Sequence, residues 1–190
     1  MVKVESESPA TKTEQAHVDR LTDKELIFFQ LEEHIHGILK DKDPESPQRH
    51  AVDDWIAALT LQADHDVVKA NLASAKEQNA PQEQTDLLQG EVERRAHNLE
   101  ILGKSVQEKI TRFAPQEGQT NPYSATMNSL HSEWYPKVHA AYQALPMVTA
   151  IESEVARDAT IMTQVASEMR FRLGMRPVSL KTKQQHTTAA

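Results

Sequence analysis

The segment from Pro81 to Phe113 constrains the fold most, because its apolar residues recur every three, four or seven positions. On a helix that turns by about 100° per residue, these positions form one apolar stripe. The stripe consists of Leu88, Val92, Leu99, Leu102, Val106, Ile110 and Phe113. Pro81 suits a first helical turn, and Pro115 disfavours helix at the residue before it. The pattern predicts a helix roughly 50 Å long that must pack against other helices.

Four further segments show the same helical periodicity, and prolines or capping residues mark their ends. The helices predicted from them cover about 22–40, 46–77, 124–145 and 146–173. Ser46 and Ser124 are residues of the type preferred at helix N-termini, and Gly174 is of the type preferred just after a helix. Pro136 predicts a kink near Trp134, because proline removes a helical hydrogen bond.

Five helical patterns separated by short turns predict an all-α fold, specifically an antiparallel helical bundle of four to five long helices. Aromatic residues make up only 5% of the chain and there are only five glycines, which disfavours an all-β fold. We predict a single bundle domain over 21–174. Polar sequences on either side predict a disordered tail at 1–20 and a basic disordered tail at 175–190.

Composition excludes several classes of protein. The absence of cysteine excludes disulfides, zinc–thiolate sites and thiol nucleophiles. A formal net charge of −7 makes the whole molecule a poor candidate for binding nucleic acid, except through its basic end. No apolar run approaches 18 residues, and the first residues lack the apolar core of a signal peptide. We therefore expect no transmembrane segment and a cytoplasmic protein.

Winding each predicted helix places at least one ionisable side chain on or near its inner face. Carboxylates and imidazoles on facing helices are the groups that hold metals in helical bundles. One interpretation is therefore a site for a divalent metal such as Fe, Mn or Zn, with the ligands Glu32, His36, Asp66, His131 and Asp158. The Glu-x-x-His spacing that di-metal bundles use twice occurs once, at Glu33 and His36.

The alternative interpretation is a structural network of polar side chains. Arg95 also falls on an inner face, and it would pair with Asp66 or Asp158, while His131 would hydrogen-bond a neighbour. Buried charges need such partners, because an unpaired buried charge costs several kcal/mol. The sequence leaves both interpretations open.

The last part of the chain is basic. No acidic residue follows Glu168, whereas five basic residues do: Arg170, Arg172, Arg176, Lys181 and Lys183. Cations favour the C-terminal end of a helix, so one interpretation is a stabilised helix end followed by a soluble tail. The other is a segment that binds an acidic partner, and apolar residues such as Val178 and Leu180 among the bases suit an amphipathic peptide.

No glycine-rich phosphate loop, Gly-x-Ser-x-Gly or His-Glu-x-x-His motif is present. We therefore favour a non-enzymatic helical-bundle protein, an adaptor or structural protein that binds another macromolecule, either a protein partner or a second copy. Leu26 and Phe29 lie off the main apolar stripe of the first predicted helix and would suit such a surface. The alternative is a metal- or small-ligand-binding four-helix bundle, such as a metal-dependent oxidase, with the carboxylate and histidine site described above.

Overall fold

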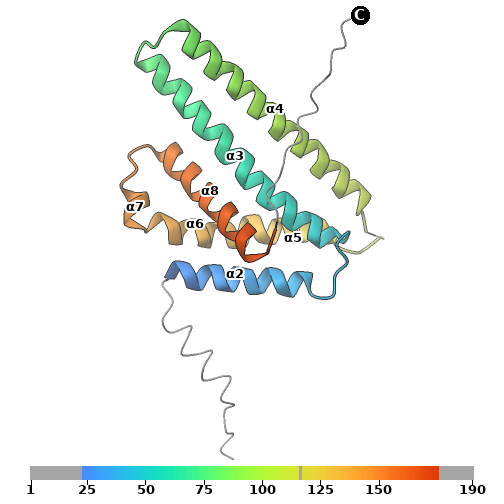
Figure 1. The fold of residues 1–190 in the computed structure, drawn as a ribbon. Helices are drawn as coiled ribbons and strands as arrows, with labels where there is room; N and C mark the ends of the chain where they lie inside the picture. The colour runs from blue at the N-terminus through green and yellow to red at the C-terminus, as the bar shows by residue number, and fades with distance from the viewer. Residues whose placement is uncertain (1–22, 116, 176–190) are drawn as a thin grey trace, which may run out of the picture.

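The computed structural model describes residues 23–115 and 117–175, and all regular structure in these residues is helical (Figure 1). The predicted all-α fold is confirmed. The elements are α2 (Asp23–Leu39), α3 (Pro47–Glu77), α4 (Gln82–Arg112), α5 (Pro122–Asn128), the π-helix η1 (Ser129–Trp134), α6 (Tyr135–Gln143), α7 (Pro146–Thr149) and α8 (Glu154–Arg172). The tail predicted at 1–20, and all of the tail predicted at 175–190 except Met175, lie outside the described residues.

The helices form two groups of different direction. Helices α4 and α8 lie on either side of α3, and both run antiparallel to it (Figure 1). Helices α2 and α6 cross below this group at an angle to α3, so the helices do not share one bundle axis (Figure 1). None of the described helices is long and apolar enough to cross a membrane.

The predicted helix ends are largely found, with one exception. The Ser46 hydroxyl accepts a hydrogen bond from the backbone N–H of Arg49 (3.4 Å) and caps α3 as predicted. Gly174 follows α8 with a φ of +61°, and the N–H of Met175 bonds back to the carbonyl of Arg170 (2.9 Å). The cap predicted at Ser124 is wrong. The helix starts three residues earlier, where the side chain of Asn121 accepts hydrogen bonds from the backbone N–H groups of Tyr123 and Ser124.

The predicted helix 124–145 is interrupted at the expected place. The π-helical turn η1 ends at Trp134, and Pro136 lies in the first turn of α6. A π-helix closes each turn with i to i+5 bonds, so it takes more residues per turn than an α-helix. Side chains beyond it therefore point in directions that a uniform 100° winding does not give. The predicted helix 146–173 is likewise divided, and Ser153 caps α8.

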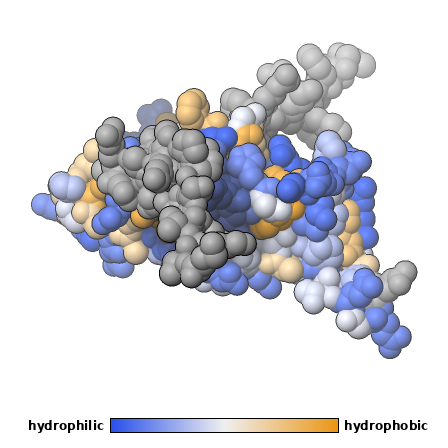
Figure 2. All heavy atoms as spheres, turned by 90° about the horizontal axis from the view of Figure 1, so that it is seen from below, coloured by the Kyte–Doolittle hydropathy of each residue, from blue (hydrophilic) through white to orange (hydrophobic). Residues whose placement is uncertain are grey.

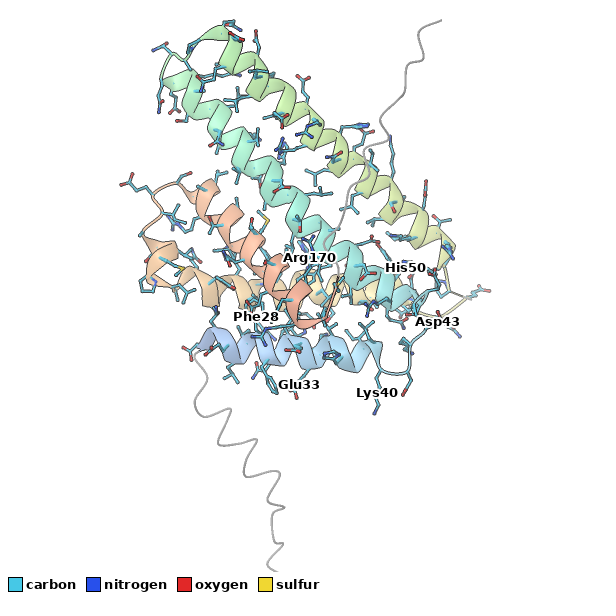
Figure 3. All side chains as sticks on the ribbon, in the orientation of Figure 1. Phe28, Glu33, Lys40, Asp43, His50 and Arg170 are labelled. Atoms are coloured by element: carbon cyan, nitrogen blue, oxygen red, sulfur yellow. The ribbon has the colours of Figure 1, made fainter. Side chains whose placement is uncertain are left out.

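The hydrophobic core lies where α2, α3, η1, α6 and α8 meet. Phe28 points from α2 into this core, whereas Glu33 and Lys40 point away from it (Figure 3). The largest fully buried side chains in the core cluster are Trp55, Phe28, Leu31, Ile35, Ile56, Leu130, Ile161, Met169, Val52, Val138 and Val148. The coloured part of the face seen from below is mainly hydrophilic, with small separate hydrophobic areas (Figure 2).

Helix α4, whose pattern is the clearest in the sequence, lies at the edge of the molecule and contains no buried residue. It packs mainly against α3. The seven residues of its predicted stripe are all only half-buried, because α3 covers most of them and α5 contacts only the end of the stripe, at Phe113. The core is therefore built around α3 and α8.

Replacing Phe28 with alanine tests this position of the core. The Phe28 ring is fully buried and packs edge-on against Tyr142, with 5.5 Å between ring centroids. We expect Phe28→Ala to lower the free energy of unfolding by about 3–5 kcal/mol, measured by urea denaturation. The matched control is Phe171→Ala, because Phe171 is 85% exposed and its loss should cost less than about 0.5 kcal/mol. Equal losses for the two variants would contradict the assignment of the core.

Candidate interaction groove between α3, α4 and α8

The five predicted metal ligands lie in three separate places. Glu32 and His36 are one turn apart on α2, with 3.7 Å between the carboxylate oxygen Oε1 and the ring nitrogen Nε2. The His36 side chain is 61% exposed, and Glu32 also accepts a hydrogen bond from Arg172 (3.0 Å). His36 is therefore exposed on α2, while the half-buried Glu32 carboxylate joins α2 to α8.

Two of the predicted ligands do come together. Asp66 on α3 and Asp158 on α8 line the same small pocket. Each carboxylate already has a histidine partner: Asp66 contacts Nδ1 of His65 (3.1 Å), and Asp158 contacts Nε2 of His139 (3.0 Å). The sequence analysis missed both histidine contacts.

The prediction that His131 points inward is wrong, because the structure places its side chain on the surface. His131 lies within η1, where the wider π-helical turn changes the direction of the following side chains. His139, one helix further on, is half-buried instead. Among the described residues, no group of three or more histidine, aspartate, glutamate or cysteine side chains is arranged to hold a metal ion. The five predicted residues do not form one ligand set.

The predicted pairing of Arg95 is also wrong. Its guanidinium bonds to the Glu91 carboxylate one turn earlier on α4, and neither Asp66 nor Asp158 is its partner. The reason is the position of α4, which lies beside α3 at the edge of the molecule and does not face α8 across a core. Arg95 is therefore half-buried and satisfied within its own helix.

The buried polar cluster that does exist joins α3, α4 and α5. Asp54 is only 6% exposed, and both of its carboxylate oxygens accept hydrogen bonds from Nζ of Lys109 (2.8 and 2.7 Å). The Tyr123 hydroxyl donates a further bond to Asp54 Oδ2 (2.7 Å). Burial and this carboxylate raise the pKa of Tyr123 above its usual value, so the hydroxyl stays a donor. Lys109 lies next to the apolar stripe of α4, three residues after Val106, a signal that the sequence analysis did not use. Asp54 lies on the side of α3 opposite to its main apolar stripe, so the periodicity of α3 gave no sign that it is buried.

Asp54 stands at one end of a groove of about 420 Å³ whose floor is α3. Helix α4 forms one wall and Arg170 of α8 the other; Figure 3 shows Arg170 between α8 and α3. The lining residues are Asp53, Asp54, Ala57, Thr60, Leu61, Asp64, Asn98, Ile101, Leu102, Ser105 and Arg170. The surface is apolar along its middle and acidic along α3, and Ile101 is 52% exposed there.

Two residues that line the groove each have one buried polar atom without a hydrogen-bond partner in the described part of the chain. These atoms are the carboxylate oxygen Oδ1 of Asp53, an acceptor, and the Nε–H of Arg170, a donor. Burial raises the pKa of Asp53 above its usual value, although the Arg49 guanidinium opposes the shift. Asp53 Oδ1 lies 3.7 Å from Nε of Arg49, so an ion pair partly compensates it, whereas the buried Arg170 Nε–H has no such partner among the described residues.

The five basic residues predicted to bind a partner divide into three groups. Arg170 lines the groove and donates to the Thr60 hydroxyl (2.7 Å). Arg172 is engaged within the molecule, since it bonds to both Glu32 (3.0 Å) and Glu168 (2.9 Å). Arg176, Lys181 and Lys183 lie outside the described residues.

Removing the positive charge from the buried cluster should destabilise the fold. Lys109→Met keeps a side chain of similar length but leaves the buried Asp54 carboxylate with only Tyr123 as a partner. We expect a loss of about 3–5 kcal/mol in the free energy of unfolding, measured by urea denaturation. Lys104→Met is the matched control on the same helix, because Lys104 pairs with Glu100 on the exposed surface and its loss should cost at most about 1 kcal/mol.

A double variant distinguishes lost charge pairing from lost packing. Asp54→Asn combined with Lys109→Met removes both charges and keeps the Tyr123 hydroxyl paired with an acceptor. We expect this double variant to be more stable than Lys109→Met alone. A double variant that is no more stable would show that the unpaired carboxylate is not the cause.

Comparison with known proteins adds no family to this description. No family model matches the sequence, and neither the curated proteins nor the solved structures gave a significant match.

Proposed function

We propose that this protein is a non-enzymatic interaction protein that binds a helical segment of a partner protein in the groove between α3, α4 and α8. The observation that carries the proposal is α4, which has 31 residues and no buried one, beside a groove with the exposed Ile101 on its wall. A helix with an apolar stripe normally buries that stripe between neighbours. Here the side of α4 that faces the groove is left open.

The shape of the groove suits a helix. Its floor contains the small residues Ala57 and Thr60, which permit close approach, and Leu61 and Leu102 offer apolar contacts beside them. A helix that lies in such a groove presents apolar residues at spacings of three, four and seven. Ile101 stands on the wall, and a bound helix would remove its exposed apolar side chain from water.

The charges of the groove indicate what flanks that apolar stripe. The carboxylates of Asp53 and Asp64 line the floor. The chain as a whole carries a formal charge of −7. We therefore expect a partner helix with lysine or arginine beside its apolar face, since complementary charges speed association and fix register. The metal-binding alternative has no comparable support, because its five residues do not converge among the described side chains.

A photocrosslinking experiment tests the groove. The protein is made with a photoreactive benzophenone amino acid in place of Ile101 and irradiated in a lysate of the source organism. It should crosslink to a protein that the same probe in place of Met147 does not capture. Met147 is the matched control, because it is apolar and 77% exposed but lies on α7, away from the groove. The captured protein is then purified, and its affinity for the wild-type protein and for two variants is measured by calorimetry.

We expect Ile101→Arg to weaken that affinity by roughly tenfold or more, as for a residue near the centre of an interface. Met147→Arg should leave the affinity within about a factor of two, because a surface residue away from the interface contributes little. Equal crosslinking at the two positions, or equal affinities of the two variants, would overturn the proposal.

A further inference from the structure

We propose that the segment 176–190 of the same chain occupies this groove when no partner is bound. The inference rests on the proposed function, because it assigns an intramolecular competitor to the same surface. It follows from three observations: where α8 ends, the charge of the residues that follow, and the reach of a segment of this length.

The end of α8 places the start of the segment next to the groove. The left-handed conformation of Gly174 and the bond from Met175 N–H to the Arg170 carbonyl fix the last described residue on the last turn of α8. Leu173 and Met175 pack against the core, which holds this end in place. Arg170, on the same turn, lines the groove. The segment therefore begins just after the turn of α8 that contributes Arg170 to the groove.

The charges of the segment and the groove are complementary. Residues 176–190 include Arg176, Lys181 and Lys183 and no acidic residue. The groove presents the carboxylates of Asp53 and Asp64. Val178 and Leu180 lie among the bases and match the apolar middle of the groove, so the segment has the chemistry expected of the partner.

The reach of the segment is sufficient. Asp53 and Asp64 are eleven positions apart on α3, a span of about 17 Å along the helix. Fifteen residues follow Met175, and fully extended they cover up to about 50 Å. A short tether also holds the segment near the groove at an effective concentration in the millimolar range, so even weak contacts are populated.

Disulfide trapping tests the proposal directly, since the chain has no cysteine of its own to compete. Both double variants carry Ser179→Cys in the segment. The second substitution is either Ser105→Cys, at a position that lines the groove, or Gln107→Cys, at a position exposed on another face of α4. The two positions are only two residues apart, so a segment that does not bind would reach both. The yield of intramolecular disulfide in a glutathione buffer is measured on non-reducing gels at several dilutions.

We expect the variant with Ser105→Cys to form at least about fivefold more disulfide than the variant with Gln107→Cys. A segment bound in the groove holds the cysteine at position 179 near position 105 and away from position 107. Adding Asp64→Lys should reduce the difference, since it reverses one of the groove charges. Equal yields would overturn the inference. A preference found only in concentration-dependent dimers would also overturn it, because the segment would then bind a second copy.

The outcome is separable from that of the proposed function. Crosslinking and affinity at Ile101 report on the partner, whereas the disulfide yield reports on the segment. If the disulfide yields are equal but Ile101→Arg loses affinity for the partner, the groove is the partner site and the segment 176–190 does not occupy it. If both proposals hold, the full chain with Lys181→Glu and Lys183→Glu should bind the purified partner more tightly than the wild-type chain does.

Discussion

Helix α3 packs against other helices on several of its sides, and the arrangement of the rest of the structure depends on these contacts. One side carries Trp55 and Ile56 into the core beside α8, and another packs against α4. Asp54 fixes α4 and α5 to α3 through Lys109 and Tyr123. Once both neighbours are in place, a strip of α3 from Asp53 to Asp64 stays uncovered between them, and that strip is the floor of the groove.

The helices were predictable because local patterns determine them. Periodicity, the cap at Ser46 and the glycine at position 174 act within a few residues, so a single sequence contains the whole signal. Asn121 shows the limit of this approach. Its side chain caps α5 and also donates to the carbonyl of Ile110, a contact that depends on how the loop after α4 folds back.

The directions of the side chains were less predictable than the helices. Uniform winding failed at His131, because η1 changes the number of residues per turn just before Pro136. Arg95 was assigned a partner across the core, which required α4 to be central. The apolar stripe of α4 indicates that the helix packs against another helix, but it does not indicate how many neighbours the helix has. The position of α4 at the edge of the molecule therefore could not be predicted from the stripe. The groove was missed for the same reason, since it arises from the relative positions of three helices.

The absence of buried residues in α4 has a consequence for how the molecule moves. Local stability follows the number of buried apolar contacts, so α4 should open and exchange its amide protons more readily than α3 or α8, which contribute most of the core. The floor of the groove, formed by α3, and the wall formed by α8 are then rigid, whereas the wall formed by α4 is more mobile. Under the proposed function, such a groove would adapt to partner helices of different width, and ordering α4 would reduce the affinity for each of them.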